Sequence, residues 1–240
     1  MNALAHPSLP PEARSTPTEL ESLALLRLIQ LASPTLPIGA YAYSQGLEAA
    51  VEQGSVSSEA DAVKWIGGVL EHGLRALDLP VLARLYAAWQ AEDENLVQRW
   101  SQFLCASRES RELLLEEEQL GESLRKLLCE LGASLAEARR VRATYLGYFA
   151  LGAVHFRVPL TPALSGYCFA WAEHQVSAAS RLIPLGPMAS QRLLSQILSL
   201  VPRTIERALT LADEGIGVTL PRQAIGSALH ETQYTRIFRS

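Results

Sequence analysis

The sequence has few cysteines and lacks any long uncharged apolar run. Its three cysteines in 240 residues, Cys105, Cys129 and Cys168, are far apart and form no CxxC pair. This argues against a disulfide framework and is typical of a protein from a reducing compartment. No uncharged apolar run reaches the roughly 18 residues of a membrane span. The first residues also lack a basic segment followed by an apolar one, so we expect no secretory signal and a cytoplasmic location.

Clustered positive charge is missing as well. The formal net charge is -4, and no run of Lys and Arg occurs, so binding to nucleic acid through such a cluster is not expected. The nucleotide-binding patterns GxxxxGK[ST] and GxGxxG and the metalloprotease pattern HExxH are absent. The five histidines lie on different predicted elements without a recognised ligand spacing. The sequence therefore gives no indication of an enzyme, a cofactor or a metal site.

Helical periodicity runs through most of the chain, and strand-like alternation is scarce. Residues 19–33, ELESLALLRLIQLAS, are apolar nearly all round, which predicts a buried helix. Ser58, with Asp61 three residues later, resembles the capping box of another helix. Residues 1–18 contain four prolines and polar spacers. We predict an all-α protein with a disordered tail over residues 1–18 and one compact multi-helix domain over residues 19–240.

Two charged runs have simple local interpretations. Glu116–Glu118 could form an acidic binding patch, but such a run is more often a solvated helix face, which is what we predict. Arg108, Glu109, Arg111 and Glu112 have the spacing of ion pairs within one helix, and such pairs stabilise a helix by tenths of a kcal/mol.

Two further segments leave alternatives open. Residues 33–48, SPTLPIGAYAYSQGLE, combine turn-forming residues with Tyr41 and Tyr43 and carry almost no charge. Such a loop can be an internal plug or a docking surface. Residues 146–179 are dense in Gly, Ala and Ser, which allows close helix packing either inside the domain or against another subunit.

The C-terminal residues are unusually apolar. We predict a last helix over residues 222–240, which would place Tyr234 and Phe238 on one face, with Ile237 beside them. A terminal segment of this composition is expected to dock, either on the protein's own core or on a partner.

Several motifs in the same order resemble the UreF family of urease accessory proteins. The segment LLRLIQLASPTLPIGAYAYSQGLEAAVEQGSV is similar to that family's N-terminal signature. The resemblance continues through DLPVLARLYAAW, SRESRELLLEEEQLG, SRLIPLGPMASQ and HETQYTRIFRS, and so covers residues 23–240. It implies an all-helical, cytoplasmic protein that forms homodimers. It also implies a non-enzymatic scaffold or gate that bridges a UreD/UreH-type protein and the GTPase UreG during nickel delivery to apo-urease.

The resemblance also implies roles for individual residues. On the UreG side these are Tyr41, Ser44, Gly46, Glu48 and Arg181, and on the UreD/UreH side they are His230, Glu231, Tyr234, Arg236 and Phe238. The loop residues are expected at or near the surface. Pro187 stands where relatives often have Gln, which puts in doubt any contact made there through a backbone N–H.

Two other functions are considered. One is a GTPase-activating protein for UreG, with Arg181 supplied in trans. The other, from a different class, is a small all-α enzyme acting on a metabolite, which would need convergent titratable groups in a pocket.

Overall fold

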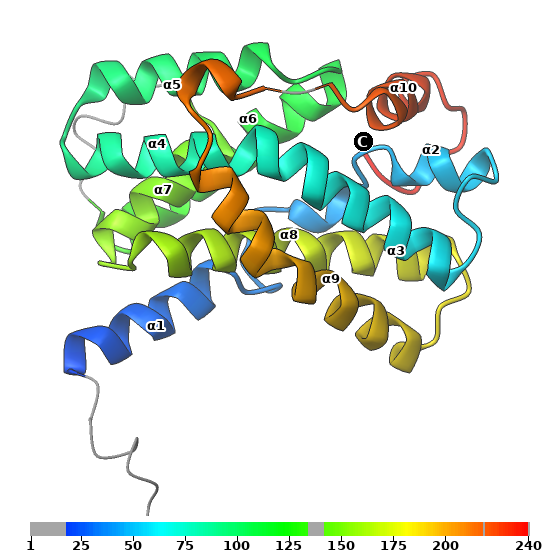
Figure 1. Cartoon of the computed structure of the whole chain (residues 1–240), viewed down its shortest axis with the longest axis horizontal. Coiled ribbons are helices and arrows are strands. Elements are labelled where there is room, and N and C mark those ends of the chain that lie inside the picture. Colours follow the sequence, from blue (N-terminus) through cyan, green and yellow to red (C-terminus); the bar gives the residue numbers. More distant parts are fainter. Residues whose placement is uncertain (1–17, 134–141, 218, 240) are drawn as a thin grey trace, which may run out of the picture.

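The computed structural model describes residues 18–133, 142–217 and 219–239, and the regular structure within these ranges is helical (Figure 1). Its α-helices are α1 (Glu19–Leu31), α2 (Leu47–Glu52), α3 (Glu59–Gly68), α4 (Asp78–Gln90), α5 (Glu94–Ala106), α6 (Arg111–Glu130), α7 (Tyr145–His155), α8 (Leu160–Leu182), α9 (Pro187–Leu209) and α10 (Pro221–His230). Short 3-10 turns at Ala40–Ala42 and Asp213–Gly215 and a π-helical turn at Val69–Leu74 complete the set. The prediction of a single all-α domain is confirmed. The predicted N-terminal tail lies outside the described residues except for Thr18, which caps α1.

Local sequence signals explain several helix boundaries. Ser58 accepts a hydrogen bond from the N–H of Asp61 at the start of α3, as the capping pattern predicted. Ser110 and Thr144 cap α6 and α7 in the same way. Pro187 occupies the first turn of α9, where a helix leaves backbone N–H groups without partners inside the helix. The missing N–H of Pro187 therefore costs this helix nothing.

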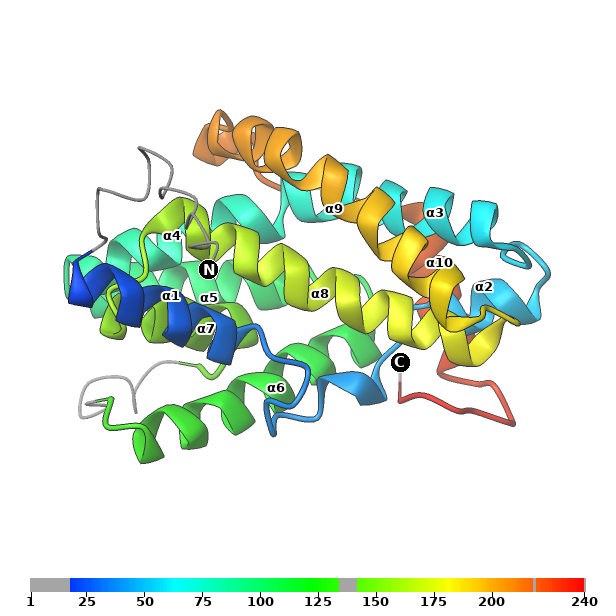
Figure 2. The same ribbon diagram turned by 90° about the horizontal axis from the view of Figure 1, so that it is seen from below.

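Helix α8 runs through the middle of the domain and contacts α1, α2, α4, α7 and α9 (Figures 1 and 2). Small residues allow these close approaches. A Cβ placed on Gly166 would lie 2.4 Å from Cδ1 of Leu28 on α1. Ala172 and Ala179 are fully buried against the same core. Within the described residues, the small-residue segment therefore serves close packing inside the domain.

Helix α1 is not the buried helix that its composition predicted. It lies against α7 and α8 and buries only Ala24 and Leu31. Large apolar side chains on its remaining faces are 49–61% exposed: Leu20, Leu23, Leu25, Leu26 and Ile29. The prediction was wrong because an all-round apolar pattern does not specify how many sides of a helix the same chain covers.

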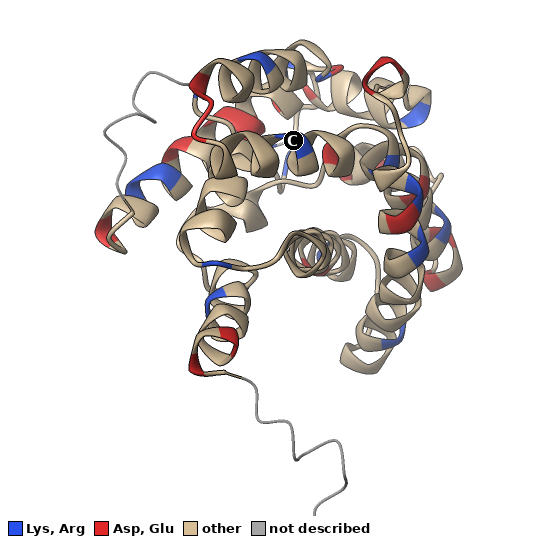
Figure 3. Ribbon diagram, turned by 60° about the vertical axis from the view of Figure 1, so that its left-hand side comes forward, with Lys and Arg blue, Asp and Glu red and all other residues tan. Residues whose placement is uncertain are grey.

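Charged residues of both signs are interspersed along the same helices, as Figure 3 shows. The described helices include none that is both long and apolar enough to cross a membrane.

Candidate partner-binding site

The loop between α1 and α2 folds beneath the C-terminal part of the protein. Gly39, Gln45 and Gly46 adopt positive φ angles of 85°, 53° and 84°, a region that glycine enters without steric cost. A Cβ on Gly46 would lie 3.1 Å from both the carbonyl oxygen of Gln223 and the nitrogen of Ser227, in α10. Gly46 is thus needed both for its conformation and for the direct approach of α10 to the loop.

The C-terminal segment does not continue α10. The helix ends at His230, and residues 231–239 are non-helical. The prediction that Tyr234 and Phe238 share a helical face is therefore wrong. Tyr234 is fully exposed, whereas Phe238 is buried in the core. The backbone explains the change, because N–H groups of this segment are donated to other elements instead of to a continued helix.

Glu48 is the main anchor of this segment. Its Oε1 accepts the N–H of Ile237 at 2.7 Å, and its Oε2 accepts the N–H of Phe238 at 2.9 Å. The N–H of Arg239 is donated to the carbonyl oxygen of Ala42, at 2.7 Å. Figures 1 and 2 show the red C-terminal segment turning back beside α2. We call residues 231–239 the C-terminal strap.

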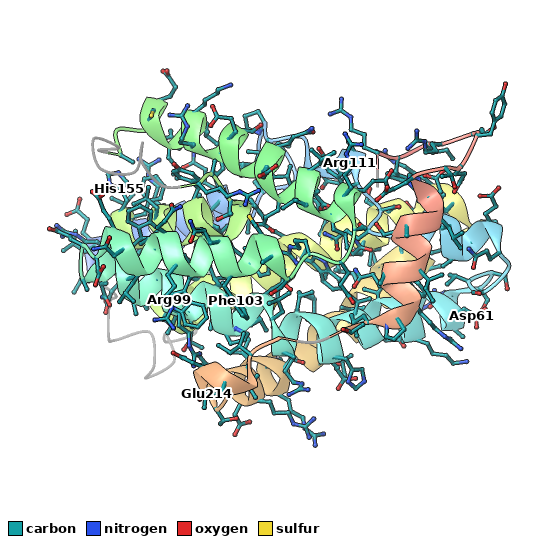
Figure 4. All side chains as sticks on the ribbon, turned by 90° about the horizontal axis from the view of Figure 1, so that it is seen from above. Asp61, Arg99, Phe103, Arg111, His155 and Glu214 are labelled. Atoms are coloured by element: carbon teal, nitrogen blue, oxygen red, sulfur yellow. The ribbon has the colours of Figure 1, made fainter. Side chains whose placement is uncertain are left out.

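His230 lies at the root of the strap and is fully buried. Its Nε2 is 3.0 Å from Oε2 of Glu48, and its Nδ1 is 2.8 Å from Oε2 of Glu112 on α6. Arg236 donates to the other oxygen of Glu112, at 3.0 Å. The backbone N–H of Arg111 is donated to Glu231, and Figure 4 shows Arg111 on the side of the molecule where this segment runs. Together these contacts tie α2, α6, α10 and the strap into one unit.

The predicted surface position of Ser44, Gly46 and Glu48 is wrong. All three are buried beneath α10 and the strap, and the Ser44 hydroxyl accepts the N–H of Glu48. This part of the loop matches the internal-plug alternative. The sequence alone did not predict this burial because the segments that cover the loop, α10 and the strap, come from the opposite end of the chain.

Tyr41 and Arg181 remain accessible to a partner. Tyr41 is partly exposed, and its hydroxyl donates to Glu173 on α8. Burial, followed by this contact with Glu173, raises the pKa of Tyr41. Arg181 is exposed in the last turn of α8, and its guanidinium lies 6.0 Å from the ring centroid of Phe238. The candidate UreG-side and UreD/UreH-side residues are therefore neighbours.

A second buried network joins α4, α6 and the α5–α6 connection. Arg108 pairs with Asp78 and Glu117, all largely buried. Although burial disfavours the charge, these carboxylates raise the pKa of Arg108 above its ordinary value. The other oxygen of Glu117 accepts the N–H of Leu146 at 2.9 Å. Sequence reasoning missed this network because its members come from different elements.

Two local interpretations of the charged runs are thereby corrected. Arg108 precedes α6 and pairs across elements instead of along one helix. Glu116 and Glu117 are buried, and only Glu118 of that run lies near solvent, paired with Arg142. Glu116 accepts a hydrogen bond from Gln45 in the loop. The prediction that this run is solvated was wrong because its partners Gln45, Arg108 and Arg142 lie outside α6, where helix spacing gives no sign of them.

A partly open pocket of about 70 Å³ lies between α4, α6 and α8. Its walls include Asp78, Arg108, Glu117 and His174. Burial lowers the pKa of His174 to about 4, so this side chain is neutral at pH 7. No group of three or more His, Cys, Asp or Glu residues suited to hold a metal ion occurs within the described ranges.

Comparison with known proteins gives a consistent result. The UreF family model matches residues 56–198. The urease accessory protein UreF of Marinobacter nauticus is 46% identical over 231 residues, which cover 95% of this chain and all of that protein. Proteins of the same name from Alkalilimnicola ehrlichii and Pseudomonas putida strain F1 are 47% and 48% identical, over 91% of this chain and 96% and 98% of their own lengths. The chain therefore belongs to the UreF family of urease accessory proteins.

Proposed function

We propose that this protein is a non-enzymatic assembly factor of the cytoplasm that bridges a UreD/UreH-type protein and the GTPase UreG during nickel insertion into apo-urease. The observation that supports this most directly is the strap, whose backbone is fixed by Glu48 while Tyr234 and Ile237 face solvent. A rigid backbone that presents exposed large side chains loses little conformational entropy on binding. This arrangement suits docking of another protein.

The UreD/UreH-side surface combines the strap with the outer face of α10. Ile225 and Leu229 are four residues apart on α10 and are 59% and 49% exposed. On the strap that follows α10, Tyr234 and Ile237 are 102% and 63% exposed. Exposed apolar groups gathered in this way mark interaction surfaces, and tyrosine is enriched among the residues that dominate binding energy. Glu231 and Arg236 supply charged groups at the edge.

The UreG-side surface consists of Tyr41 and Arg181. Glu48 instead holds the strap, Gly46 supports α10, and Ser44 accepts the N–H of Glu48. Arg181 lies over Phe238, so the position of the UreG-side cation depends on a residue of the strap. A protein that bridges two partners needs neighbouring surfaces of this kind. A scaffold acts by binding one conformational state of UreG more tightly than the others, and it needs no group that takes part in GTP hydrolysis.

A variant of the strap tests the bridging role. We expect Tyr234→Ala combined with Ile237→Ala to abolish co-purification of the UreD/UreH-type protein with unchanged far-UV circular dichroism, because neither side chain is buried. Leu96→Ala, which truncates a 40% exposed leucine on α5, is the matched control and should retain capture. Retained capture by the double variant would contradict the assignment of this surface.

Activation of GTP hydrolysis is the second candidate function, and the exposure of Arg181 favours it. An arginine supplied in trans can accelerate GTP hydrolysis by about 10³–10⁵-fold. UreG turnover should be measured alone, with this protein and with the Arg181→Ala variant. Arg203→Ala, another exposed arginine, on α9, is the control. Acceleration lost only in Arg181→Ala identifies a GTPase-activating protein, and unchanged turnover in all cases supports the scaffold.

The homodimer implied by the family is assigned to the exposed apolar face of α1. Several large side chains of α1 are about half exposed, and monomeric proteins rarely leave such a patch uncovered. A groove of about 270 Å³, with Leu25, Pro159 and Pro162 in its walls, lies beside it. A second copy would cover both features.

The alternative of a metabolite enzyme gains no support from the pocket between α4, α6 and α8. Its volume of about 70 Å³ is well below the roughly 300–1,000 Å³ of small-molecule sites. A wider groove of about 540 Å³ lies between α3 and the start of α10. Two of its polar side chains are engaged locally, because Asp61 binds the capping Ser58 and pairs with Lys64.

A further inference from the structure

The contacts of His230 require a specific protonation state. Both ring nitrogens lie within 3.0 Å of a carboxylate oxygen, Nε2 facing Glu48 and Nδ1 facing Glu112. An ionised carboxylate can only accept hydrogen bonds, and a neutral imidazole has one N–H to donate. With Glu48 and Glu112 both ionised, the two contacts are satisfied together only when the ring carries two protons. His230 is fully buried, so water cannot replace either contact directly.

With both carboxylates ionised, the charges around the ring of His230 balance only when the ring is protonated. The ring is faced by Glu48 from α2, Glu112 from α6 and, through Glu112, Arg236 from the strap. Two carboxylates and two cations then give a neutral cluster. The nearby Glu231 is exposed and accepts a backbone N–H. Loss of the imidazole proton leaves an uncompensated negative charge and opposes a nitrogen lone pair to a carboxylate oxygen, which is costly in a buried site.

The same two carboxylates hold the strap. Glu48 accepts the N–H groups of Ile237 and Phe238, and Glu112 accepts a hydrogen bond from Arg236. Three anchors of the strap therefore depend on the side chains that flank His230. The helices keep their own backbone hydrogen bonds, and Phe238 is the strap residue that joins their hydrophobic core, so the strap can detach while the helices stay folded.

We propose that His230 is a proton-dependent latch: with both ring nitrogens protonated it closes the strap onto α2 and α6, and loss of that proton at alkaline pH releases residues 231–239 while the helical core stays folded. This inference does not rest on the proposed function. It makes the position of the strap, and with it the arrangement of the exposed Tyr234 and Ile237, depend on pH.

Amide hydrogen exchange of the full-length protein tests the latch. Protection of the Ile237 and Phe238 amides, corrected for the intrinsic exchange rate, is measured between pH 6 and pH 9. The control is the amide of Leu146, which is also donated to a buried carboxylate, Glu117. That carboxylate pairs with Arg108, whose charge does not change in this range.

Release coupled to loss of one proton can change protection by up to about tenfold per pH unit. We expect protection of Ile237 and Phe238 to fall at least roughly tenfold across the range, with Leu146 unchanged. A flat wild-type profile, or an equal fall at all three amides, would overturn the proposal.

The Glu112→Gln variant separates the latch from a general alkaline effect. A glutamine can accept from Arg236 and donate its amide N–H to Nδ1 of a neutral His230. The strap of this variant should stay protected at pH 9. Glu130→Gln, which changes an exposed carboxylate at the far end of the same helix α6, should keep the wild-type profile. A wild-type loss of protection in Glu112→Gln would count against the proposal, and if that variant does not fold, the wild-type profile still decides.

Discussion

Truncating Phe238 tests whether the strap belongs to this protein's own core. Phe238 is 5% exposed, and its backbone N–H is donated to Glu48. Burial of a side chain of this size contributes about 1.5–3 kcal/mol, and Phe→Ala in a closed core costs about 3–5 kcal/mol. The strap is non-helical and can detach locally instead of leaving a cavity, so its docking free energy limits the loss. We expect Phe238→Ala to lower the free energy of unfolding by about 2 kcal/mol, near the burial value.

Urea denaturation followed by far-UV circular dichroism measures this loss. Tyr234→Ala is the matched control because it removes a fully exposed aromatic ring from the same strap. A surface change of that kind should alter the free energy of unfolding by no more than about 0.5 kcal/mol. Equal stability of the two variants would refute the reasoning, since it would mean that the buried position of Phe238 contributes nothing to the fold.

Four further variants test other parts of the structure. Arg108→Met leaves two buried carboxylates without their cation and should lower the free energy of unfolding by about 3–5 kcal/mol in urea denaturation. A loss below about 1 kcal/mol, which is typical of surface ion pairs, would contradict the burial of this ion-pair network. Leu25→Glu with Ile29→Glu should convert a dimer to a monomer in light scattering, and a persistent dimer would show that α1 is not the interface. Gly46→Ala adds a Cβ at positive φ within 3.1 Å of the α10 backbone, so the melting temperature should fall measurably, and an unchanged value would argue against that packing. The folded-state pKa of His174 is lowered to about 4, so the unfolded chain binds a proton at this side chain before the folded protein does, and the free energy of unfolding falls as the pH drops from about 6.5 toward 4. His174→Gln should reduce this loss of stability. A variant with the same dependence of stability on pH as the wild type would contradict the argument.

The helices were largely predictable because their signals are local. The capping pair at Ser58 and Asp61 identified the start of α3. What the sequence could not show is which faces are covered. The outward side of α1 and the buried Glu117 were both misjudged, because coverage depends on elements distant in the sequence.

The candidate site shows the same limit more strongly. His230 and Glu48 are 182 residues apart, and His230 and Glu112 are 118 apart. No spacing rule connects such positions. The family resemblance identified several of these residues but assigned Glu48 and His230 to different surfaces. Their actual contact follows from the packing of α10 on α2, and the strap then returns to the same Glu48.

This contact changes how variants of the loop must be interpreted. Gly46 supports α10, and Glu48 holds the backbone of the strap. A substitution at either position therefore alters the strap before it alters any direct contact with UreG. Tyr41 and Arg181 do not bind the Glu48 carboxylate, so their substitution removes accessible groups and leaves that anchor in place. Loss of UreG capture is therefore evidence for a direct contact only when it occurs in variants of Tyr41 or Arg181 whose strap amides remain protected from exchange.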